Sequence, residues 1–324
     1  MPDFVLPEKL NSLIRGFQAS RVLLTAIELD IFGQLGAGAT AGEVAQRIET
    51  NPRATEMLLN ALVAFEALDK TGDRFLPKPF CELLTGERRV GWLHTAHLWT
   101  SWSQLTRCVR TGSPAQVDEI ARREPGWQQA FIAAMENSAI ERAPLVADAL
   151  GGGPIHKMLD VGGGSAAYSI AFARKHPELE ATVFDLPEIL PITSGYIDAA
   201  EMRSQLRMVA GDLRTDRFGE GYDLVLLSAI CHMLSEEENL DLLKRCRAAL
   251  VSGGRIVIQE FFLNDSKTGP IPATLFSLNM LIGTAGGAAY STAEYSHWLQ
   301  LAGFNIPTPH PLPGPTGLLI ATAR

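Results

Sequence analysis

Residues 158–173 read MLDVGGGSAAYSIAFA, a stretch that passes from an apolar strand through three glycines into a helix. Gly162, Gly163 and Gly164 allow the backbone to approach a ligand without interference from a Cβ atom. The spacing Gly162-x-Gly164-x-x-Ala167 also fits a dinucleotide fold, in which a pyrophosphate lies at the helix N-terminus. The stretch therefore predicts a nucleotide-type site at a strand end, and neighbouring residues must define the ligand.

Around this stretch, short apolar segments alternate with helical segments, a rhythm typical of a parallel sheet. The pattern predicts an α/β fold, a Rossmann-like doubly wound sheet with an antiparallel last strand. Ligands of such sheets bind beyond the carboxyl ends of the strands. We expect strands at Lys157–Val161, Ala181–Asp185, Leu206–Ala210, Tyr222–Ser228 and Gly254–Glu260, then a closing pair near Phe304–Pro307 and Gly317–Ala321.

Gly151-Gly-Gly-Pro154 is the expected boundary between two domains, residues 1–150 and 151–324. The first domain is mostly helical in its periodicity. A capping box, a helix and a short hairpin follow one another at Thr40–Glu43, Pro52–Leu68 and Lys70–Leu76. This order predicts a winged-helix-like domain.

A winged helix often binds DNA, but the second helix here, PRATEMLLNALVAFEAL, is apolar on most faces and has Arg53 as its basic residue. A buried helix that forms a dimer is the better interpretation. The formal charge of −8 and the lack of a basic run also argue against a nucleic-acid partner. A regulator that binds DNA through this domain remains the alternative from a different functional class.

The composition is that of an ordinary globular protein, with 46% hydrophobic and 20% charged residues. Neither a signal-peptide pattern nor an apolar stretch of about 20 residues is evident, so we expect a cytoplasmic protein without a membrane partner. Four cysteines lack metal-like pairing, so we expect neither zinc nor disulfides; they are Cys81, Cys108, Cys231 and Cys246.

Carboxylates at successive strand ends indicate which nucleotide binds. Asp160 precedes the glycines, where it would oppose a pyrophosphate but favour the cationic amino-acid end of S-adenosylmethionine. Asp185 is placed to accept both ribose hydroxyls, and Asp212 with Leu213 to contact adenine. Alternatively, the glycines serve helix packing, Asp185 is a turn residue before Pro187, and Asp212 caps a helix. Their common order along the strands favours the cofactor site.

The segments SRVLLTAIELDIFGQL, LDVGGGSAAY, VFDLPEIL and LLSAICHMLSEEENLDLLKRCRAAL together resemble the dimeric small-molecule O-methyltransferases, the family of plant caffeic acid, bacterial polyketide and animal hydroxyindole enzymes. The resemblance covers nearly the whole chain. It implies a homodimer, S-adenosylmethionine as cofactor, and a small, aromatic hydroxylated acceptor of secondary metabolism. The cofactor-binding residues expected from the motifs are Asp160, Gly162, Gly164, Asp185, Leu186, Asp212, Leu213 and Ser228.

The same resemblance places His232 at the position of the catalytic base and Glu260 at that of the acid that orients it. An imidazole can take a phenol proton as the methyl group is transferred, and a carboxylate fixes its tautomer. The alternative is that His232 caps the helix that begins near Ser235 and that Glu260 is a solvated strand end.

Several family residues are replaced here. The aspartate after the histidine is Met233, the lysine before this turn is Ser228, a second acid is Ala289, and an arginine is Tyr290. These departures keep open N- or C-methylation on the same scaffold, which needs less from a base, or a protein that binds the cofactor without transfer.

By resemblance, the acceptor lies between the domains, against the segments WQQAFIAAMENS and LFSLNMLIGTAGG. Aromatic residues and methionines at helical spacing pack in cores more often than they bind ligands, so each residue alone has a packing interpretation. The expected substrate contacts are Trp127, Phe131, Met135, Phe276, Asn279, Met280 and Tyr290.

Overall fold

The computed structural model describes residues 7–115, 127–150 and 155–324 of the chain, with only the backbone described at 87 and 127–130. The chain forms two compact units, Met1–Trp99 and Thr100–Arg324. The sequence placed the boundary near residue 151 instead. The helices that precede residue 151 belong to the second unit because their apolar side chains, Val146 and Ala147 among them, join the core of its sheet.

The first unit combines helices with a small sheet of order β1-β3-β2. Its elements are α1 (Glu8–Glu28), α2 (Ile31–Leu35), β1 (Ala39–Thr40), α3 (Ala41–Arg47), α4 (Pro52–Ala64), β2 (Leu68–Thr71), β3 (Arg74–Pro77) and the 3-10 helix η1 (Pro79–Leu84). The α5 helix (Gly86–Trp102) continues from it into the second unit. The expected hairpin and the capping box of Thr40 and Glu43 are both present, which confirms the winged-helix-like order.

The second unit carries the large sheet. Its helices are α6 (Leu105–Thr111), α8 (Trp127–Ala139), α9 (Arg142–Ala149), α10 (Ala167–Lys175), α11 (Leu190–Ala199), η2 (Cys231–Met233), α12 (Glu236–Ala249), α13 (Ile271–Gly283) and α14 (Thr292–Leu301). Its strands are β4 (Lys157–Val161), β5 (Glu180–Asp185), β6 (Leu206–Ala210), β7 (Tyr222–Ser228), β8 (Leu250–Glu260), β9 (Thr308–Pro311) and β10 (Gly317–Thr322).

The seven strands have the order β6-β5-β4-β7-β8-β10-β9. Strands β6, β5, β4, β7 and β8 are parallel, and β10 pairs with β8 in antiparallel register. From β4 the chain proceeds through β5 and β6 toward one edge of the sheet, and then returns to β7 on the other side of β4. The direction of strand order therefore changes at β4. The carboxyl ends of β4, β5, β6, β7 and β8 therefore meet at one edge, where a doubly wound sheet binds its ligand.

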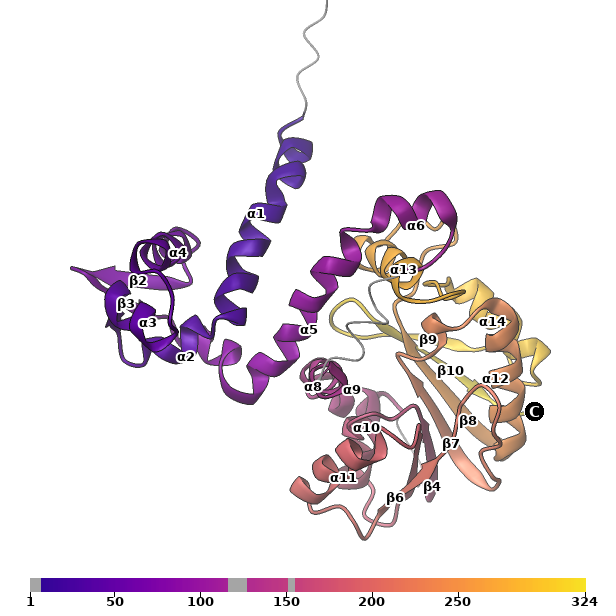
Figure 1. Cartoon of the computed structure of the whole chain (residues 1–324). Helices are drawn as coiled ribbons and strands as arrows, with labels where there is room; N and C mark the ends of the chain where they lie inside the picture. Colours follow the sequence, from indigo (N-terminus) through magenta and orange to yellow (C-terminus); the bar gives the residue numbers. More distant parts are fainter. Residues whose placement is uncertain (1–6, 116–126, 151–154) are drawn as a thin grey trace, which may run out of the picture. The chain divides into compact units, whose positions relative to one another are not determined.

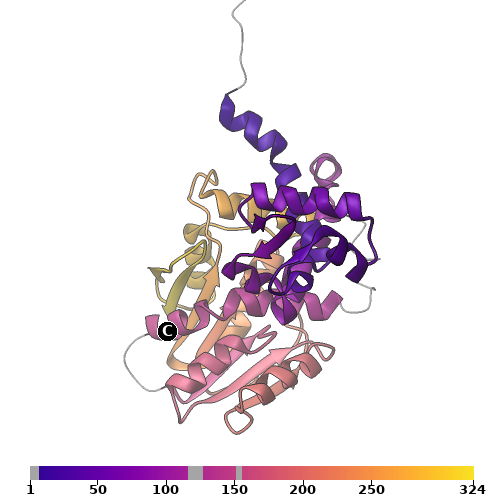
Figure 2. The ribbon, with the colours of Figure 1, turned by 90° about the vertical axis from the view of Figure 1, so that its left-hand side faces the viewer.

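Helices cover both faces of this sheet (Figures 1 and 2). On one face, α12 and α14 bury Leu242, Cys246 and Trp298 against the strands. On the other face, α9, α10 and α11 bury side chains that include Phe172 and Ile197. Burial on both faces explains why the central strands read as continuous apolar runs in the sequence.

One expected strand lies elsewhere. The closing pair was predicted near Phe304–Pro307 and Gly317–Ala321, but Phe304 makes only a single bridge to Ala323, and β9 follows it. The sequence of β9, TPHP, contains two prolines, which cannot donate to a ladder and are confined to edge strands. Its position at the edge of the sheet accommodates them. Among the described residues, no helix combines the length and apolarity needed to cross a membrane.

Candidate active site

The glycine stretch forms a tight loop between β4 and α10. Gly162 and Gly164 have φ values of +70° and +53°, and Ala166 has φ +64°. A Cβ atom on Gly162 would lie 2.3 Å from Cδ1 of Ile230, just after β7, so a larger residue here would have to displace the Ile230 side chain and also adopt a left-handed φ. The Gly162 N–H donates to the Phe184 carbonyl at 2.7 Å, which holds the loop at the carboxyl end of β4, where the sequence predicted it.

Asp185 ends β5 beside this loop. Its Oδ2 accepts a hydrogen bond from the Gly164 N–H at 2.8 Å, and its Oδ1 accepts one from the Leu186 N–H at 2.7 Å. Burial raises the pKa of the Asp185 carboxyl, and these two backbone donors oppose the rise. The carboxylate is therefore fixed at the strand end, at the position predicted for a ribose contact.

Asp160 lies on β4 and is 1% exposed. The Ser169 hydroxyl donates to its Oδ2 at 2.7 Å. Burial raises the pKa of Asp160 to about 6, although the Ser169 hydrogen bond favours the charged form. Because the carboxylate is buried, Asp160 can act on a ligand only through the backbone of the loop or through a bridging water molecule.

The end of β6 supplies the residues predicted for adenine. The Asp212 Oδ1 accepts from the Arg214 N–H at 2.8 Å, an Asx-type turn. The Leu213 side chain packs toward the glycine loop, because a Cβ built on Gly162 would lie 3.7 Å from its Cδ2. The ends of β4, β6 and β7 thus converge on one place.

His232 and Glu260 are adjacent, as the sequence predicted. The His232 Nδ1 lies 3.0 Å from Oε1 and 2.9 Å from Oε2 of Glu260, and the His232 N–H donates to Oε1 at 3.2 Å. Glu260 is 1% exposed at the end of β8, so it is not the solvated strand end of the alternative interpretation. A carboxylate facing Nδ1 favours the tautomer in which Nδ1 carries the proton and Nε2 is a free base.

The turn that carries His232 is held from several sides. Ala229, at φ +56°, begins it, and its N–H donates to the Gln259 carbonyl at 3.0 Å. The buried Asn239 amide of α12 donates to the carbonyls of Cys231 and Leu234. The helix itself is capped by Ser235. His232 is therefore not needed as a cap.

Two stacked aromatic rings lie next to the histidine. Phe276 of α13 meets the His232 ring edge to face, with centroids 4.6 Å apart. Phe261 stacks on Phe276 at 4.1 Å. Phe276 was expected as a substrate contact, whereas Phe261 was missed, although it directly follows Glu260 in the sequence. The stacked pair places flat apolar surface beside the histidine.

The other residues expected to contact the acceptor lie in varied surroundings. The Asn279 Oδ1 accepts from the Trp102 indole N–H at 2.9 Å, and Met280 is buried. Tyr290 donates its hydroxyl to the Leu234 carbonyl at 2.6 Å within an aromatic cluster, the geometry of a packing residue. Phe131 and Met135 lie half-buried on α8, and the side chain of Trp127 lies outside the described residues.

A polar network connects Tyr168 of α10, just after the glycine loop, with Ser228 at the end of β7 and Gln259 on β8. The Gln259 Oε1 accepts from the Tyr168 hydroxyl at 2.7 Å and from the Ser228 hydroxyl at 2.5 Å, and its amide donates to Thr316 at 2.9 Å. Ser228 is thus held by Gln259, the residue before Glu260. Gln259 was not predicted, although a glutamine within the apolar run RIVIQE was a signal of a buried polar contact.

Gly287 makes room for the turn that carries the histidine. A Cβ at this position would lie 2.3 Å from the His232 carbonyl oxygen and 2.9 Å from the Met233 Cα. We expect Gly287→Ala to displace the turn and lower kcat about tenfold, because small errors of position are costly in catalysis. Steady-state kinetics will measure this. Gly195→Ala on α11 is the matched control, since a Cβ there meets nothing within 4 Å; equal kcat for both variants would contradict the argument.

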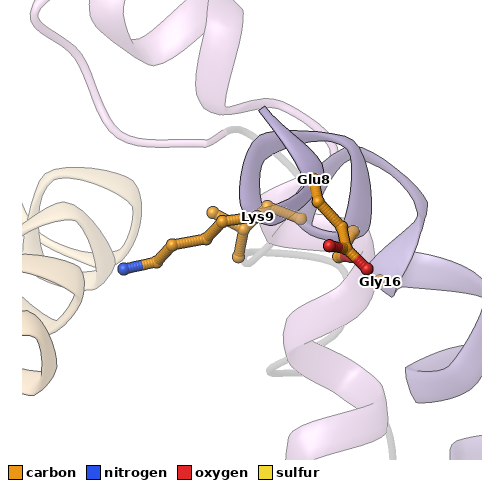
Figure 3. Close-up of a pocket in the computed structure, with 5 residues that line it drawn as sticks. Glu8, Lys9 and Gly16 are labelled. Atoms are coloured by element: carbon orange, nitrogen blue, oxygen red, sulfur yellow. The ribbon is translucent and has the colours of Figure 1, made fainter. Parts of the chain in front are cut away.

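The surface hollow in Figure 3 belongs to the first unit. It runs along α1 and is lined by Glu8, Lys9, Ser12, Leu13 and Gly16. None of the residues predicted for cofactor or catalysis lies there. Large apolar side chains of this helix are exposed: Leu13 is 67% exposed, and Ile14 and Phe17 are exposed as well. Several exposed apolar side chains on one helix are typical of a protein interface.

Comparison with known proteins agrees with this geometry. Residues 107–305 match the model of the O-methyltransferase domain, and residues 11–87 match that of the O-methyltransferase dimerisation domain. The chain is 34% identical to 3-hydroxy-5-methyl-1-naphthoate 3-O-methyltransferase of Streptomyces sahachiroi, over 93% of this chain and 90% of that protein.

Two further matches extend this agreement. L-tyrosine C(3)-methyltransferase of Streptomyces lavendulae is 30% identical, over 97% of this chain and 92% of that protein. A solved structure described as PigF with SAH superimposes with a TM-score of 0.89 at 26% identity, covering 98% of this chain and 100% of that one. The chain belongs to the O-methyltransferase family, and its N-terminal part is the dimerisation domain of that family.

Proposed function

We propose that this chain transfers a methyl group from S-adenosylmethionine to a hydroxyl group of a small aromatic metabolite, with His232 as the general base. The observation that carries the proposal is the pairing of His232 Nδ1 with both oxygens of the buried Glu260, next to the Phe261 and Phe276 rings. This arrangement combines a base of fixed tautomer with a flat apolar surface.

The residues at the strand ends fit the cofactor chemically. The glycine loop allows a ligand to approach the backbone closely, and Asp185 at the end of β5 suits the ribose hydroxyls, with Leu186 as its apolar neighbour. Asp212 and Leu213 suit an adenine amino group and ring, while Asp160 supplies negative charge beneath the loop. Ser228 is also proposed as a cofactor contact, on the strength of the family resemblance. When bound, S-adenosylmethionine supplies an electrophilic methyl group on a cationic sulfur.

The protein's part in the reaction is to hold and deprotonate the acceptor. The Nε2 of His232 accepts the hydroxyl proton as the acceptor oxygen bonds to the methyl carbon and the old sulfur–carbon bond breaks. Glu260 keeps the proton on Nδ1 and stabilises the imidazolium that forms. Burial of both side chains excludes water from the proton transfer.

The proposed class of acceptor rests on the stacked Phe261 and Phe276 rings and on the names of the relatives. Phe261 and Phe276 favour a planar ring, and the relative from Streptomyces sahachiroi is named for a hydroxylated naphthoate. We also propose Phe131, Met135, Asn279 and Met280 as acceptor contacts, on the strength of the family resemblance.

The homodimer is proposed from the dimerisation-domain match and the exposed apolar side chains of α1, and light scattering should give the mass of two chains.

The test is transfer of a labelled methyl group from S-adenosylmethionine to hydroxynaphthoates and simple phenols. Each acceptor is paired with its methyl ether, which has no hydroxyl proton to lose. We expect label in at least one phenolic acceptor and none in the matched ether. Label in the ether, or in neither partner of any pair although S-adenosylhomocysteine binds, would overturn O-methylation of aromatic hydroxyls.

C-methylation is the second candidate function, because a relative of 30% identity is named as a tyrosine C(3)-methyltransferase. The same base could remove the phenol proton and leave the ring carbon as the nucleophile. NMR of the product separates the two reactions: an O-methyl ether supports the leading proposal, and a ring methyl with the phenol retained supports the alternative.

A further inference from the structure

The helix α8 brings an acidic side chain to the glycine loop from outside the sheet. Ile132 and Glu136 are four residues apart and therefore share one face of the helix. A Cβ built on Gly164 would lie 3.6 Å from the Ile132 Cδ1, so this face packs on the loop. The Ser165 hydroxyl, within the loop, donates to the Glu136 Oε2. Glu136 thus stands directly over the loop.

The two aspartates near the loop are engaged in other ways. Asp160 lies beneath it, since a Cβ on Gly163 would be 3.1 Å from the Asp160 Cγ, and its Oδ2 accepts from Ser169. Asp185 accepts from the amides of Gly164 and Leu186 at the position suited to the ribose. Glu136 is less buried than Asp160 and accepts its hydrogen bond from Ser165 of the loop itself.

We infer that the Glu136 carboxylate binds the α-ammonium group of the amino-acid end of S-adenosylmethionine. This inference rests on the proposed function, since it requires that cofactor in the loop. Its chemistry is a charge-assisted hydrogen bond between a carboxylate and an ammonium in partly desolvated surroundings. Burial raises the pKa of the Glu136 carboxyl; the Ser165 hydrogen bond and the charge of Arg174 oppose this rise, and a ligand ammonium would oppose it further. The Ser165 hydrogen bond holds the carboxylate in place before the ligand binds.

The experiment measures binding by calorimetry with two ligands, S-adenosylhomocysteine and its analogue that lacks the α-amino group. The ligands differ only in the group that Glu136 is inferred to bind. Wild-type protein should bind S-adenosylhomocysteine about tenfold more tightly than the desamino analogue. Glu136→Gln, which keeps the shape and removes the charge, should lose that preference while binding the analogue as wild type does.

Glu141→Gln serves as the control, because Glu141 is an exposed acid just beyond α8; it should keep the wild-type preference. The inference is overturned if Glu136→Gln keeps the preference, or if it weakens both ligands equally, which would mean that Glu136 only shapes the loop. Failure of the proposed function looks different: wild-type protein would then bind neither ligand.

Discussion

Replacing His232 by alanine should lower kcat for methyl transfer to an aromatic acceptor by about 10²- to 10⁴-fold. The expected loss is this large because the Nε2 of His232 is the group proposed to take the acceptor proton, and alanine leaves no base in its place. Affinity for S-adenosylhomocysteine should change little, since the proposed cofactor contacts lie at the loop and at the ends of β5 and β6. Steady-state kinetics and calorimetry measure the two quantities separately.

His297→Ala is the control for this prediction, because His297 is an exposed histidine on α14 of the same unit. Its kcat should equal that of the wild type. If His232→Ala keeps kcat within a few-fold, His232 is a structural residue of the turn, and the acceptor is deprotonated by another group or by solvent.

The second large effect is expected for Glu260→Gln, which should lower kcat by about 10- to 100-fold. The carboxylate accepts from the His232 Nδ1 through both oxygens. A glutamine amide can donate to Nδ1 instead, which favours the tautomer with the proton on Nε2, where it blocks the base. Kinetics with the acceptor used for His232→Ala will measure the loss.

Glu260→Asp tests whether the charge is what matters. It keeps the carboxylate on a shorter side chain, so it should retain more activity than Glu260→Gln, and thermal unfolding should show both variants folded. An activity order in which the glutamine variant matches the wild type would contradict the orienting role. Met233 and Ala289 stand where the family resemblance suggested two more acids, so the orienting role proposed for Glu260 has to be filled without them.

The sheet, and the edge at which its strands end, could be predicted because each buried strand appears in the sequence as a short apolar run. The segments at 157–161, 206–210 and 222–228 were predicted with the bounds that the structure has. The pairing of His232 with Glu260 was predicted from the family resemblance. Comparison with known proteins confirmed the family.

Features that depend on long-range packing could not be predicted. The domain boundary was placed at the glycine-rich segment, but α8 and α9 join the second unit through side chains that meet only in the folded chain. Phe261 stacks on Phe276 of α13, and Glu136 of α8 accepts a hydrogen bond from Ser165 of the glycine loop. In both cases the partner is distant in the sequence, so neither contact could be predicted from it. The edge strand β9 was misplaced because its prolines give no strand signal.

The most direct test of the cofactor site is titration of the wild-type protein with S-adenosylhomocysteine, compared with Asp185→Ala and Asp223→Ala. Asp223 also accepts two backbone N–H groups, from His156 and Lys157, but at the amino end of β4. We predict micromolar binding by the wild type and by Asp223→Ala, and at least tenfold weaker binding by Asp185→Ala. No binding by the wild type, or equal binding by all three proteins, would contradict the proposed site.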